Sequence, residues 1–340
     1  LNLINFTKYS SINYIIFGKN LNYFKKNLKS DYKFVDFKIN YNFLNLFFII
    51  LDLKKKLIFY KIKIIHAHTQ RAAFLACLIK YIFLLKDLRI IYTPHGFRHS
   101  QLFSIKYFIH LLIEKFILNI INHIILISRD ELLILKSLRK IEISKTFIPT
   151  AIPRIKYKKS ISLKKKLKIK KDSKIILMCG SVQNIKQPNL FIEIAEKLLK
   201  IYPDIFFVWL GKQIDKTKKY DKSRIKFFGN ISDKVKYHSY MRSADIFLMT
   251  SKIETYPLSI LEAKKIGLKI VCNNFRGANK IIKKSSSEYL FKYNNIDNAV
   301  MILKKILSNK KIFLKNDSHY KENPINLFCK KHIDIYRSIN

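Results

Sequence analysis

The second half of the chain alternates short apolar runs with longer segments of helical periodicity, and this alternation limits the choice of fold more than any other feature. The apolar runs are residues 173–181, 204–212, 224–230, 245–250, 268–273 and 288–291. The helical segments are residues 188–200, 233–244, 257–267 and 277–283. Strands of about five residues that alternate with helices form βαβ units, and such units build a parallel sheet. We therefore predict an α/β fold with a parallel sheet.

The first half repeats this pattern less regularly. Strands are predicted at 61–68, 88–96 and 123–128, with a helix at 70–85. The most apolar segment, 107–127, contains histidine, glutamate, lysine and asparagine side chains, so we predict a buried helix that runs into a strand instead of a membrane span. A linker is expected at 148–174, where two prolines precede a dense run of lysines.

Composition separates the candidate classes of function only weakly. The chain has 340 residues, a net charge of +43 and a hydrophobic fraction of 49%, which suits two globular domains. Abundant Lys, Ile, Asn, Phe and Tyr beside only 7 glycines are typical of A+T-rich coding sequence, and this accounts for most of the basicity. The charge would still attract anionic lipid headgroups. A nucleic-acid-binding protein is disfavoured because no motif of that class accompanies the spread lysines.

The four cysteines indicate a reducing compartment. Cys77, Cys179, Cys272 and Cys329 are far apart, lie in apolar surroundings and form no C-x-x-C pair. We expect all four to be buried free thiols.

The stretch "SKIETYPLSILEAKKIGLKIV", residues 251–271, carries the strongest chemical signal. Glu254 follows a predicted strand, Pro257 suits the first turn of a helix, and Gly267 suits its end. The backbone amides of residues 258–260 would then be free at a helix N-terminus, where they form an anion site. Glu254 and Glu262 flank that site and can each accept hydrogen bonds from paired hydroxyls. A nucleotide sugar, with phosphates between two sets of hydroxyls, has this shape.

This stretch resembles the E-x7-E region of glycosyltransferase family 4, whose members are retaining enzymes of GT-B architecture. The resemblance spans residues 62–338 and is densest over 175–291. It implies two doubly wound Rossmann-like domains that face an interdomain cleft. The implied domains are an acceptor-side domain at 1–155, to which a closing helix at 325–340 returns, and a nucleotide-sugar-binding domain at 156–324.

The resemblance also assigns roles to the residues of this stretch. It implies that Glu254 contacts the hydroxyls of the donor sugar as a catalytic residue and that Glu262 holds the nucleotide ribose. The backbone at Pro257, Leu258 and Ser259 would hold the diphosphate.

A second stretch, "CGSVQNIKQPNLFIEIAEKL" at 179–198, is similar to the phosphate loop of the family. Gly180 would allow close approach of the backbone, and Lys186 would stand over the diphosphate. The chain departs from the family at Ser181, where an arginine is usual, and at Lys280, where an acid is usual. Both departures put full activity and the identity of the donor in question. Arg276 is a candidate to replace the missing cation.

Two histidine motifs lie in the first half. The strand-to-helix segment "IIHAHTQRAA", 64–73, places both histidine rings on one face of a strand, which could suit a metal, but no third ligand is evident. The resemblance explains the segment better, as a junction that lines the cleft with His68 and Arg71. "YTPHGF", 92–97, resembles the segment with a cleft histidine, so His95 is assigned to the transferred sugar and diphosphate.

The resulting interpretation is a metal-independent, retaining glycosyltransferase of envelope polysaccharide or lipopolysaccharide synthesis. The sequence has no D-x-D motif, and no cofactor is implied because the nucleotide sugar is a substrate. Expected partners are a nucleotide-sugar donor, a glycan or lipid-linked acceptor and an anionic membrane surface, with the protein at the cytoplasmic face of the plasma membrane. Two alternatives stay open: a catalytically weakened binding protein, motivated by Ser181, Lys280 and the lack of an evident N-terminal glycine-rich loop, and a GT-B-fold UDP-sugar epimerase.

Overall fold

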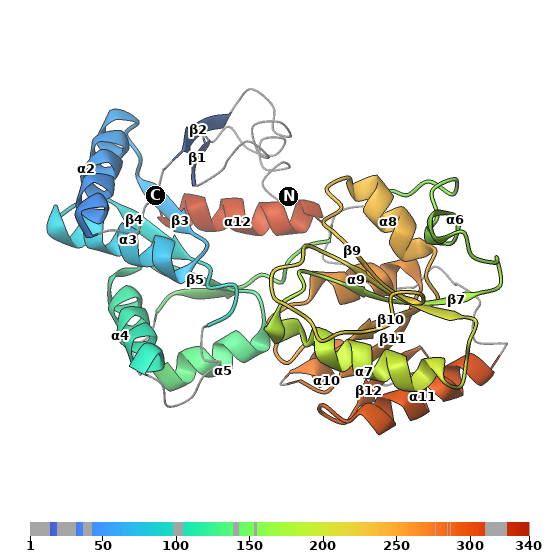
Figure 1. The fold of residues 1–340 in the computed structure, drawn as a ribbon. Coiled ribbons are helices and arrows are strands. Elements are labelled where there is room, and N and C mark those ends of the chain that lie inside the picture. The colour runs from blue at the N-terminus through green and yellow to red at the C-terminus, as the bar shows by residue number, and fades with distance from the viewer. Residues whose placement is uncertain are drawn as a thin grey trace. The chain divides into compact units, whose positions relative to one another are not determined.

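The chain folds into two compact units, residues 1–153 with 322–340 and residues 154–321 (Figure 1). The computed structural model describes residues 14–18, 32–36, 43–97, 105–138, 143–152, 155–275, 277–283, 285, 287–309 and 325–339. The units are described separately below. The domain boundary proposed after residue 155 stays a prediction.

The second unit is built on a six-stranded parallel sheet in the order β12-β11-β10-β7-β8-β9. The strands are β7 (Lys174–Cys179), β8 (Ile205–Leu210), β9 (Ile225–Phe228), β10 (Ile246–Met249), β11 (Lys269–Asn273) and β12 (Glu288–Phe291). The helices are α6 (Leu163–Leu167), η2 (Asn184–Lys186), α7 (Pro188–Leu199), α8 (Lys234–Arg242), α9 (Leu258–Ile266), α10 (Ala278–Ile281) and α11 (Ile296–Ser308). Every strand and helix predicted for this half is present, so the α/β prediction is confirmed.

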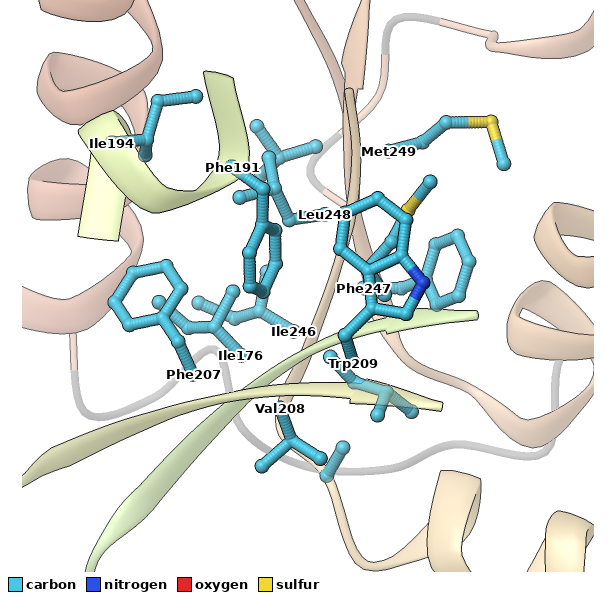
Figure 2. Close-up of a cluster of buried hydrophobic side chains, with 14 of the residues drawn as sticks. Ile176, Phe191, Ile194, Phe207, Val208, Trp209, Ile246, Phe247, Leu248 and Met249 are labelled. Atoms are coloured by element: carbon cyan, nitrogen blue, oxygen red, sulfur yellow. The ribbon is translucent and has the colours of Figure 1, made fainter. Parts of the chain in front are cut away.

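Helices cover both faces of this sheet. In Figure 1, α7 and α11 lie together on one face, and α8 and α9 lie together on the other. The central strands β11, β10, β7 and β8 are therefore mostly apolar and buried, as expected for a parallel sheet covered on both sides, whereas the edge strands β9 and β12 are only partly buried. Figure 2 shows Phe191 and Ile194 of α7 facing the strand residues Phe207 and Trp209. The Phe191 ring meets the Trp209 ring edge-on, with 5.1 Å between ring centroids.

The prediction of a linker at 148–174 is wrong for most of its length. The described residues from 155 onward pack on the second unit, and Leu163 is fully buried in its core. The hydroxyls of Ser239 and Ser243 accept hydrogen bonds from the backbone amides of Lys158 and Leu163, at 2.9 and 2.8 Å. Among the lysines lie apolar residues that pack on the core of the unit and fix the segment, namely Ile155, Ile161, Leu163, Leu167 and Ile169.

The first unit contains a four-stranded parallel sheet in the order β3-β4-β5-β6 and a separate parallel pair, β1-β2. The strands are β1 (Tyr14–Gly18), β2 (Tyr32–Asp36), β3 (Ile64–Ala67), β4 (Arg89–Tyr92), β5 (His123–Leu126) and β6 (Lys145–Phe147). The helices are α2 (Phe43–Phe59), α3 (Gln70–Ile82), α4 (Ile105–Ile120), α5 (Arg129–Leu138) and α12 (Ile325–Ile339).

Adjacent residues of the central strands face opposite layers of this unit. Ile90 of β4 and Ile124 of β5 pack into the cluster formed with α3 and α4. Their neighbours Ile91 and Ile125 pack with Phe328, Cys329 and Ile333 of α12. The period of two along each strand therefore places α12, from the end of the chain, on the face opposite α3 and α4.

The apolar segment 107–127 forms α4 and then β5, as predicted, but α4 is not fully buried. Phe108, Ile109 and Leu112 are half exposed or more, whereas Glu114 is buried. Within the described part of the chain, every helix is too short or too polar to span a bilayer. The four cysteines are buried free thiols, which confirms that prediction.

Candidate functional site

The predicted phosphate loop begins where β7 ends. Gly180 adopts φ 140°, and its carbonyl oxygen accepts a hydrogen bond of 2.7 Å from the indole nitrogen of Trp209. Gly211, at the end of β8, lies so close that a Cβ atom there would sit 1.8 Å from the Gly180 carbonyl oxygen. The two glycines therefore allow a tight backbone approach at the carboxyl edge of the sheet, with the half-buried Ser181 following Gly180.

Lys186 and Glu254 meet in an ion pair at this edge. The Lys186 ammonium donates to Glu254 Oε1, and the Ser251 hydroxyl donates to the same oxygen at 2.7 Å. Both side chains are mostly buried, with 22% and 10% of the Lys186 and Glu254 side chains exposed. The two charges that the resemblance assigns to the diphosphate and to the donor sugar thus neutralise each other here.

The loops that carry this pair are joined by backbone contacts. The Thr250 hydroxyl donates to the Lys186 carbonyl oxygen at 2.8 Å, and the Lys252 amide donates to the Ile185 carbonyl oxygen at 2.9 Å. The short helix η2 is therefore held against the loop that follows β10. A fixed backbone on both sides keeps the ammonium and the carboxylate in place without a ligand.

Helix α9 starts beside Glu254, one residue later than predicted. Pro257 is its N-cap residue, and Gly267 ends it in the left-handed conformation, with φ 84°. The Ile260 amide donates to the Pro257 carbonyl oxygen at 3.1 Å, so the prediction of a free amide at that position is wrong. The anion site that the sequence predicts is reduced to the amides of Leu258 and Ser259.

Glu262 lies one turn into α9 and is held by two side chains of α8. The Tyr237 hydroxyl donates to Oε2 at 3.1 Å, and His238 Nε2 lies 3.4 Å from Oε1. His238 Nδ1 is buried without a hydrogen-bond partner among the described residues. A proton on Nε2 fits both observations, because it would be donated to the carboxylate and leave Nδ1 bare. The free lone pairs of the Glu262 carboxylate can accept hydroxyls.

Asn273, which the sequence analysis did not select, connects the loops around this site. It is fully buried at the end of β11, and its amide nitrogen donates to the carbonyl oxygens of Thr250 and Ser251 at 3.3 and 3.2 Å. The same nitrogen contacts Gln187 and Asn294 side-chain oxygens at 3.2 and 3.1 Å. The sequence did carry a signal for Asn273, because this polar residue directly follows the apolar residues 270–272 of the predicted strand.

The structure says less about the two remaining predicted residues of this unit. Arg276 lies outside the described residues. Lys280 is exposed on α10, which begins after Gly277 in the left-handed conformation. The roles predicted for Gly180, Ser181, Lys186, Glu254, Glu262 and the start of α9 stay predictions. The structure does bring Lys186, Glu254 and the α9 terminus together.

In the first unit the predicted histidines form a chain of contacts. The rings of His66 and His68 lie on one side of β3, with 4.1 Å between ring centroids. His68 Nδ1 lies 3.0 Å from His95 Nε2, so one of these atoms donates to the other. His66 contacts the Thr93 hydroxyl at 2.8 Å and the Tyr336 hydroxyl of α12 at 2.7 Å.

His95 occupies an unusual backbone conformation that a buried carboxylate supports. Its φ is 52°, which non-glycine residues adopt rarely and which marks local strain. The Glu131 carboxylate accepts the amide of the next residue, Gly96, at 2.7 Å and that of Ile127 at 2.7 Å. Glu131 is 1% exposed, and burial raises its pKa although these backbone amides act in the opposite direction. The sequence analysis missed this support because Gly96 and Glu131 lie 35 residues apart in the chain.

The pKa values of His66, His68 and His95 are all lowered, which favours their neutral forms. Burial lowers the pKa of His66 well below its usual range, and the neighbouring His68 lowers it further. The His68 side chain reaches solvent, yet the surrounding protein removes enough water from its ring to lower its pKa. The neighbouring His95 lowers the pKa of His68 further. Burial lowers the pKa of His332 on α12 to about 4. Neutral imidazoles can donate or accept hydrogen bonds at pH 7 without adding charge.

The described residues offer no set of ligands for a metal ion at these histidines. Among the described residues, no group of three or more His, Cys, Asp or Glu side chains is arranged to hold a metal ion. Arg71 lies exposed on the first turn of α3, beside Gln70, which donates to Glu114 Oε2 at 2.6 Å. The cleft roles of His68, Arg71 and His95 stay predictions.

Comparisons with known proteins show which family the chain resembles. The model of the family "Glycosyltransferase Family 4" matches residues 27–152, and that of "Glycosyl transferases group 1" matches residues 160–325. The UDP-Gal:alpha-D-GlcNAc-diphosphoundecaprenol alpha-1,3-galactosyltransferase of Escherichia coli is 25% identical over 285 residues, which are 77% of this chain and 72% of that protein. The O-antigen biosynthesis glycosyltransferase WclY of Escherichia coli is 26% identical over 239 residues, which are 66% of this chain and 64% of that protein.

Solved structures share the fold at low identity. Sucrose-phosphate synthase from Thermosynechococcus elongatus has a TM-score of 0.76 at 14% identity, covering 99% of this chain and 91% of that one. Anabaena HepE in complex with UDP and glucose has a TM-score of 0.75 at 13% identity, covering 96% of this chain and 100% of that one. The two family matches lie side by side along most of the chain, which therefore belongs to the group 1 glycosyltransferases of family 4, with the GT-B fold.

Proposed function

We propose that this glycosyltransferase moves a sugar, with retention, from a UDP-sugar to the glycan of a lipid-linked acceptor. The observation that carries the proposal is the meeting of Lys186, Glu254 and the N-terminus of α9 at one edge of the six-stranded sheet. The lipid-linked acceptor is supported by the printed name of the Escherichia coli galactosyltransferase, and UDP by that name and by the HepE complex.

The donor would bind by replacing contacts that the protein now makes with itself. Its diphosphate takes the Lys186 ammonium and the amides of Leu258 and Ser259, because a helix N-terminus favours anions. Glu254, released from Lys186, accepts hydroxyls of the donor sugar. Glu262 accepts the ribose hydroxyls with its lone pairs that Tyr237 and His238 leave open.

Transfer then needs no nucleophile from the protein. The bond between the anomeric carbon and the diphosphate oxygen breaks, and an acceptor hydroxyl oxygen bonds to the same carbon on the same face. The hydroxyl proton passes to the departing diphosphate oxygen. Lys186 and the α9 amides stabilise the negative charge that develops, which is commonly the largest contribution to rate. His95 contacts the transferred sugar, and Glu254 supports positive charge at the anomeric carbon.

These residues also define what else the reaction requires. Lys186 and the amides supply the positive charge that a divalent cation provides in other transferases, so we propose metal-independent activity without a cofactor. We propose further that the protein works at the cytoplasmic face of the plasma membrane, where lipid-linked acceptors and anionic headgroups are available. Activity that persists in EDTA is the expected outcome.

A thermal-shift screen of UDP-, GDP-, dTDP- and ADP-sugars tests the donor site. A ligand at 100 times its Kd should stabilise the protein by about 2.7 kcal/mol, or several degrees in Tm. The UDP class should shift the wild type and leave Glu262→Ala unshifted. Incubation with that donor and a polyprenyl-diphosphate glycan, followed by NMR of the anomeric linkage, tests transfer and retention. A shift by another nucleotide class alone would contradict the UDP assignment, and an inverted linkage would contradict retention.

Ser181 favours a second candidate, a binding protein with weakened catalysis. Where the family usually has an arginine beside the diphosphate, this chain offers only a hydroxyl. A lost charge-assisted contact to phosphate costs about 1.5–3 kcal/mol. Donor binding without any transfer or hydrolysis would favour this candidate over the transferase.

A further inference from the structure

Helix α2 has a second apolar face that the protein leaves uncovered. Its inner face packs Ile49, Ile50, Leu53 and Leu57 against the end of α3 and the start of β4. Its outer face exposes 59% of Phe47, 64% of Phe48, 60% of Ile58 and 77% of Phe59. At 3.6 residues per turn these four side chains fall opposite the inner set. Four large apolar side chains exposed on one face of a helix indicate a surface that binds a partner.

Large apolar side chains are also exposed at the end of the neighbouring helix. α2 packs against α3, and the two helices are neighbours in Figure 1. At the end of α3, Tyr81, Ile82 and Leu84 are exposed by 66%, 53% and 76%. We call Phe47, Phe48, Ile58, Phe59, Tyr81, Ile82 and Leu84 together the α2–α3 surface. These seven large apolar side chains, on α2, at the end of α3 and just beyond it, exceed the scattered exposure of an ordinary surface.

A helix of the second unit shows the ordinary arrangement for comparison. α11 buries Ala299, Leu303 and Ile306, and Met301 is its one large apolar side chain in the exposed class. The rest of its exposed positions are polar or charged, including Lys304 and Lys305. The composition of the chain therefore does not by itself produce an exposed apolar face such as that of α2, which α4 shares in part through Phe108, Ile109 and Leu112.

The charge around the α2–α3 surface indicates the chemistry of the partner. Residues 43–63 contain five lysines and one aspartate, and residues 80–89 contain three basic residues and one aspartate. Lys55 is exposed on the outer face of α2 itself, and Lys61 and Lys63 are exposed just beyond its end. Asp52 already pairs with Lys56 at 2.5 Å. Exposed aromatic and aliphatic side chains among lysines fit the boundary between acyl chains and anionic headgroups.

We propose that the α2–α3 surface docks this protein on an anionic lipid bilayer. α2 lies in the plane of the membrane, Phe47, Phe48, Ile58 and Phe59 enter the acyl boundary, and the lysines meet headgroup phosphates. The biological role of this docking rests on the proposed function, since a lipid-linked acceptor lies in the membrane. The physical docking does not depend on catalysis and can be measured without a donor.

Co-sedimentation of the full chain with lipid vesicles tests the proposal. The wild type should bind vesicles of phosphatidylcholine and phosphatidylglycerol at 7:3 and bind pure phosphatidylcholine far more weakly. Phe48→Ser with Phe59→Ser should weaken binding by about tenfold for each phenylalanine withdrawn. These side chains lie outside the core, so the fold should persist. Lys55→Gln should weaken binding to the anionic vesicles by about fivefold.

A matched control keeps the test specific. Met301→Ser with Ile201→Ser removes two exposed apolar side chains from the second unit and should leave vesicle binding unchanged. Equal binding by the two double variants, or no binding of the wild type to anionic vesicles, would overturn the proposal. A wild-type dimer that Phe48→Ser with Phe59→Ser dissociates, seen by sedimentation velocity, would identify a second copy of the chain as the occupant and overturn it as well.

Donor binding separates this proposal from the proposed function. The Phe48→Ser, Phe59→Ser variant should keep the thermal shift with a UDP-sugar, because the α2–α3 surface holds none of the donor residues. Vesicle binding by a protein that shifts with no nucleotide sugar would leave the docking proposal standing and remove the proposed function. The opposite result would remove the docking proposal alone.

Discussion

The two units place different chemistry at the ends of their parallel strands. In the second unit, charged groups meet partners: Lys186 pairs with Glu254, and Tyr237 donates to Glu262. In the first unit, His66, His68 and His95 form a chain of neutral side chains. Helix termini and lysine suit a ligand with fixed negative charge, whereas neutral imidazoles suit hydrogen bonds to hydroxyls.

This difference between charged pairs and neutral imidazoles indicates how each region would respond to a ligand. A charged pair must be broken before either member can serve a substrate, so donor binding in the second unit exchanges one set of ionic contacts for another. The histidine chain requires no such exchange, but protonation can disrupt it. Substitutions at the two regions should therefore differ in size and in their dependence on pH.

Removing the lysine should have the largest effect. We expect Lys186→Ala to lower kcat by 10²–10³-fold, because a positioned charge on the leaving diphosphate is lost and Glu254 is left mostly buried without its partner. Steady-state transfer assays with the identified donor measure this. Lys197→Ala, which breaks the exposed pair with Asp297, is the control and should change kcat by less than about twofold. Similar kcat values for both variants would refute the role of Lys186.

Changing the histidine at the end of β4 should have a smaller effect. We expect His95→Asn to lower kcat about 10- to 100-fold, the range for losing one hydrogen bond to a charged or reacting group. Asparagine tolerates the left-handed backbone that His95 adopts, so the loop should keep its shape. Circular dichroism should be unchanged, and a thermal shift with the UDP-sugar should persist at a reduced size, because Lys186 and the α9 amides still hold the diphosphate. Wild-type kcat in this variant would confine the chemistry to the second unit.

The sequence predicted the second unit better than the first for a physical reason. The central strands of the second unit are buried on both faces and its longer helices have one apolar side, so the period changes clearly from one element to the next. In the first unit, α2 and α4 are apolar on exposed faces as well, and the pattern no longer shows which side is inside. The same obscurity hid α6, where lysines surround buried Leu163.

The candidate site was predictable where a motif is local and not where support comes from a distance. Glu254, Pro257 and Glu262 lie within nine positions, so their relation was readable from helix geometry. Glu131, on α5, accepts a hydrogen bond from the amide of Gly96, the residue after His95. Asn273, at the end of β11, contacts three other loops. Such contacts depend on which strand ends meet in the sheet, and residue spacing does not carry that information. The pairing of Lys186 with Glu254 was likewise unpredicted.

Acid should destabilise the protein through its buried histidines. The pKa of His332 is about 4 in the folded chain and ordinarily 6.5, so the unfolded chain binds the proton first as pH falls. Stability is unaffected by this group above pH 6.5, falls between pH 6.5 and 4, and then levels off. The expected loss from His332 is about 2 kcal/mol between pH 7 and pH 5.

Urea unfolding of wild type and His332→Leu at both pH values measures this loss. The variant should lose about 2 kcal/mol less than the wild type over the same interval, because leucine does not titrate. Part of the acid sensitivity should remain, since burial also lowers the pKa of His66. Equal losses in the two proteins would mean that His332 is not kept neutral by its surroundings.

The smallest expected effect concerns the residue that follows Gly180. Ser181→Arg restores the cation that the family usually places there, and we expect it to tighten UDP-sugar binding by up to about tenfold, the value of one charge-assisted contact to phosphate. Isothermal titration with the donor measures the change. Ser181→Gln is the control, because it adds length without charge and should leave the Kd unchanged. The neighbouring Val182 is fully buried, so an arginine there would disturb the core and could not serve as a control.

The outcome at position 181 bears on the comparison of the two units. If arginine tightens binding and raises kcat together, the second unit lacks only a charge, and the neutral histidine chain is already adequate for transfer. If binding tightens while kcat stays the same, the charge stabilises the bound donor and the transition state equally, and the limit lies elsewhere in the reaction. An unchanged Kd would mean that the diphosphate does not approach Gly180, and the phosphate loop assigned to residues 179–198 would then be wrong.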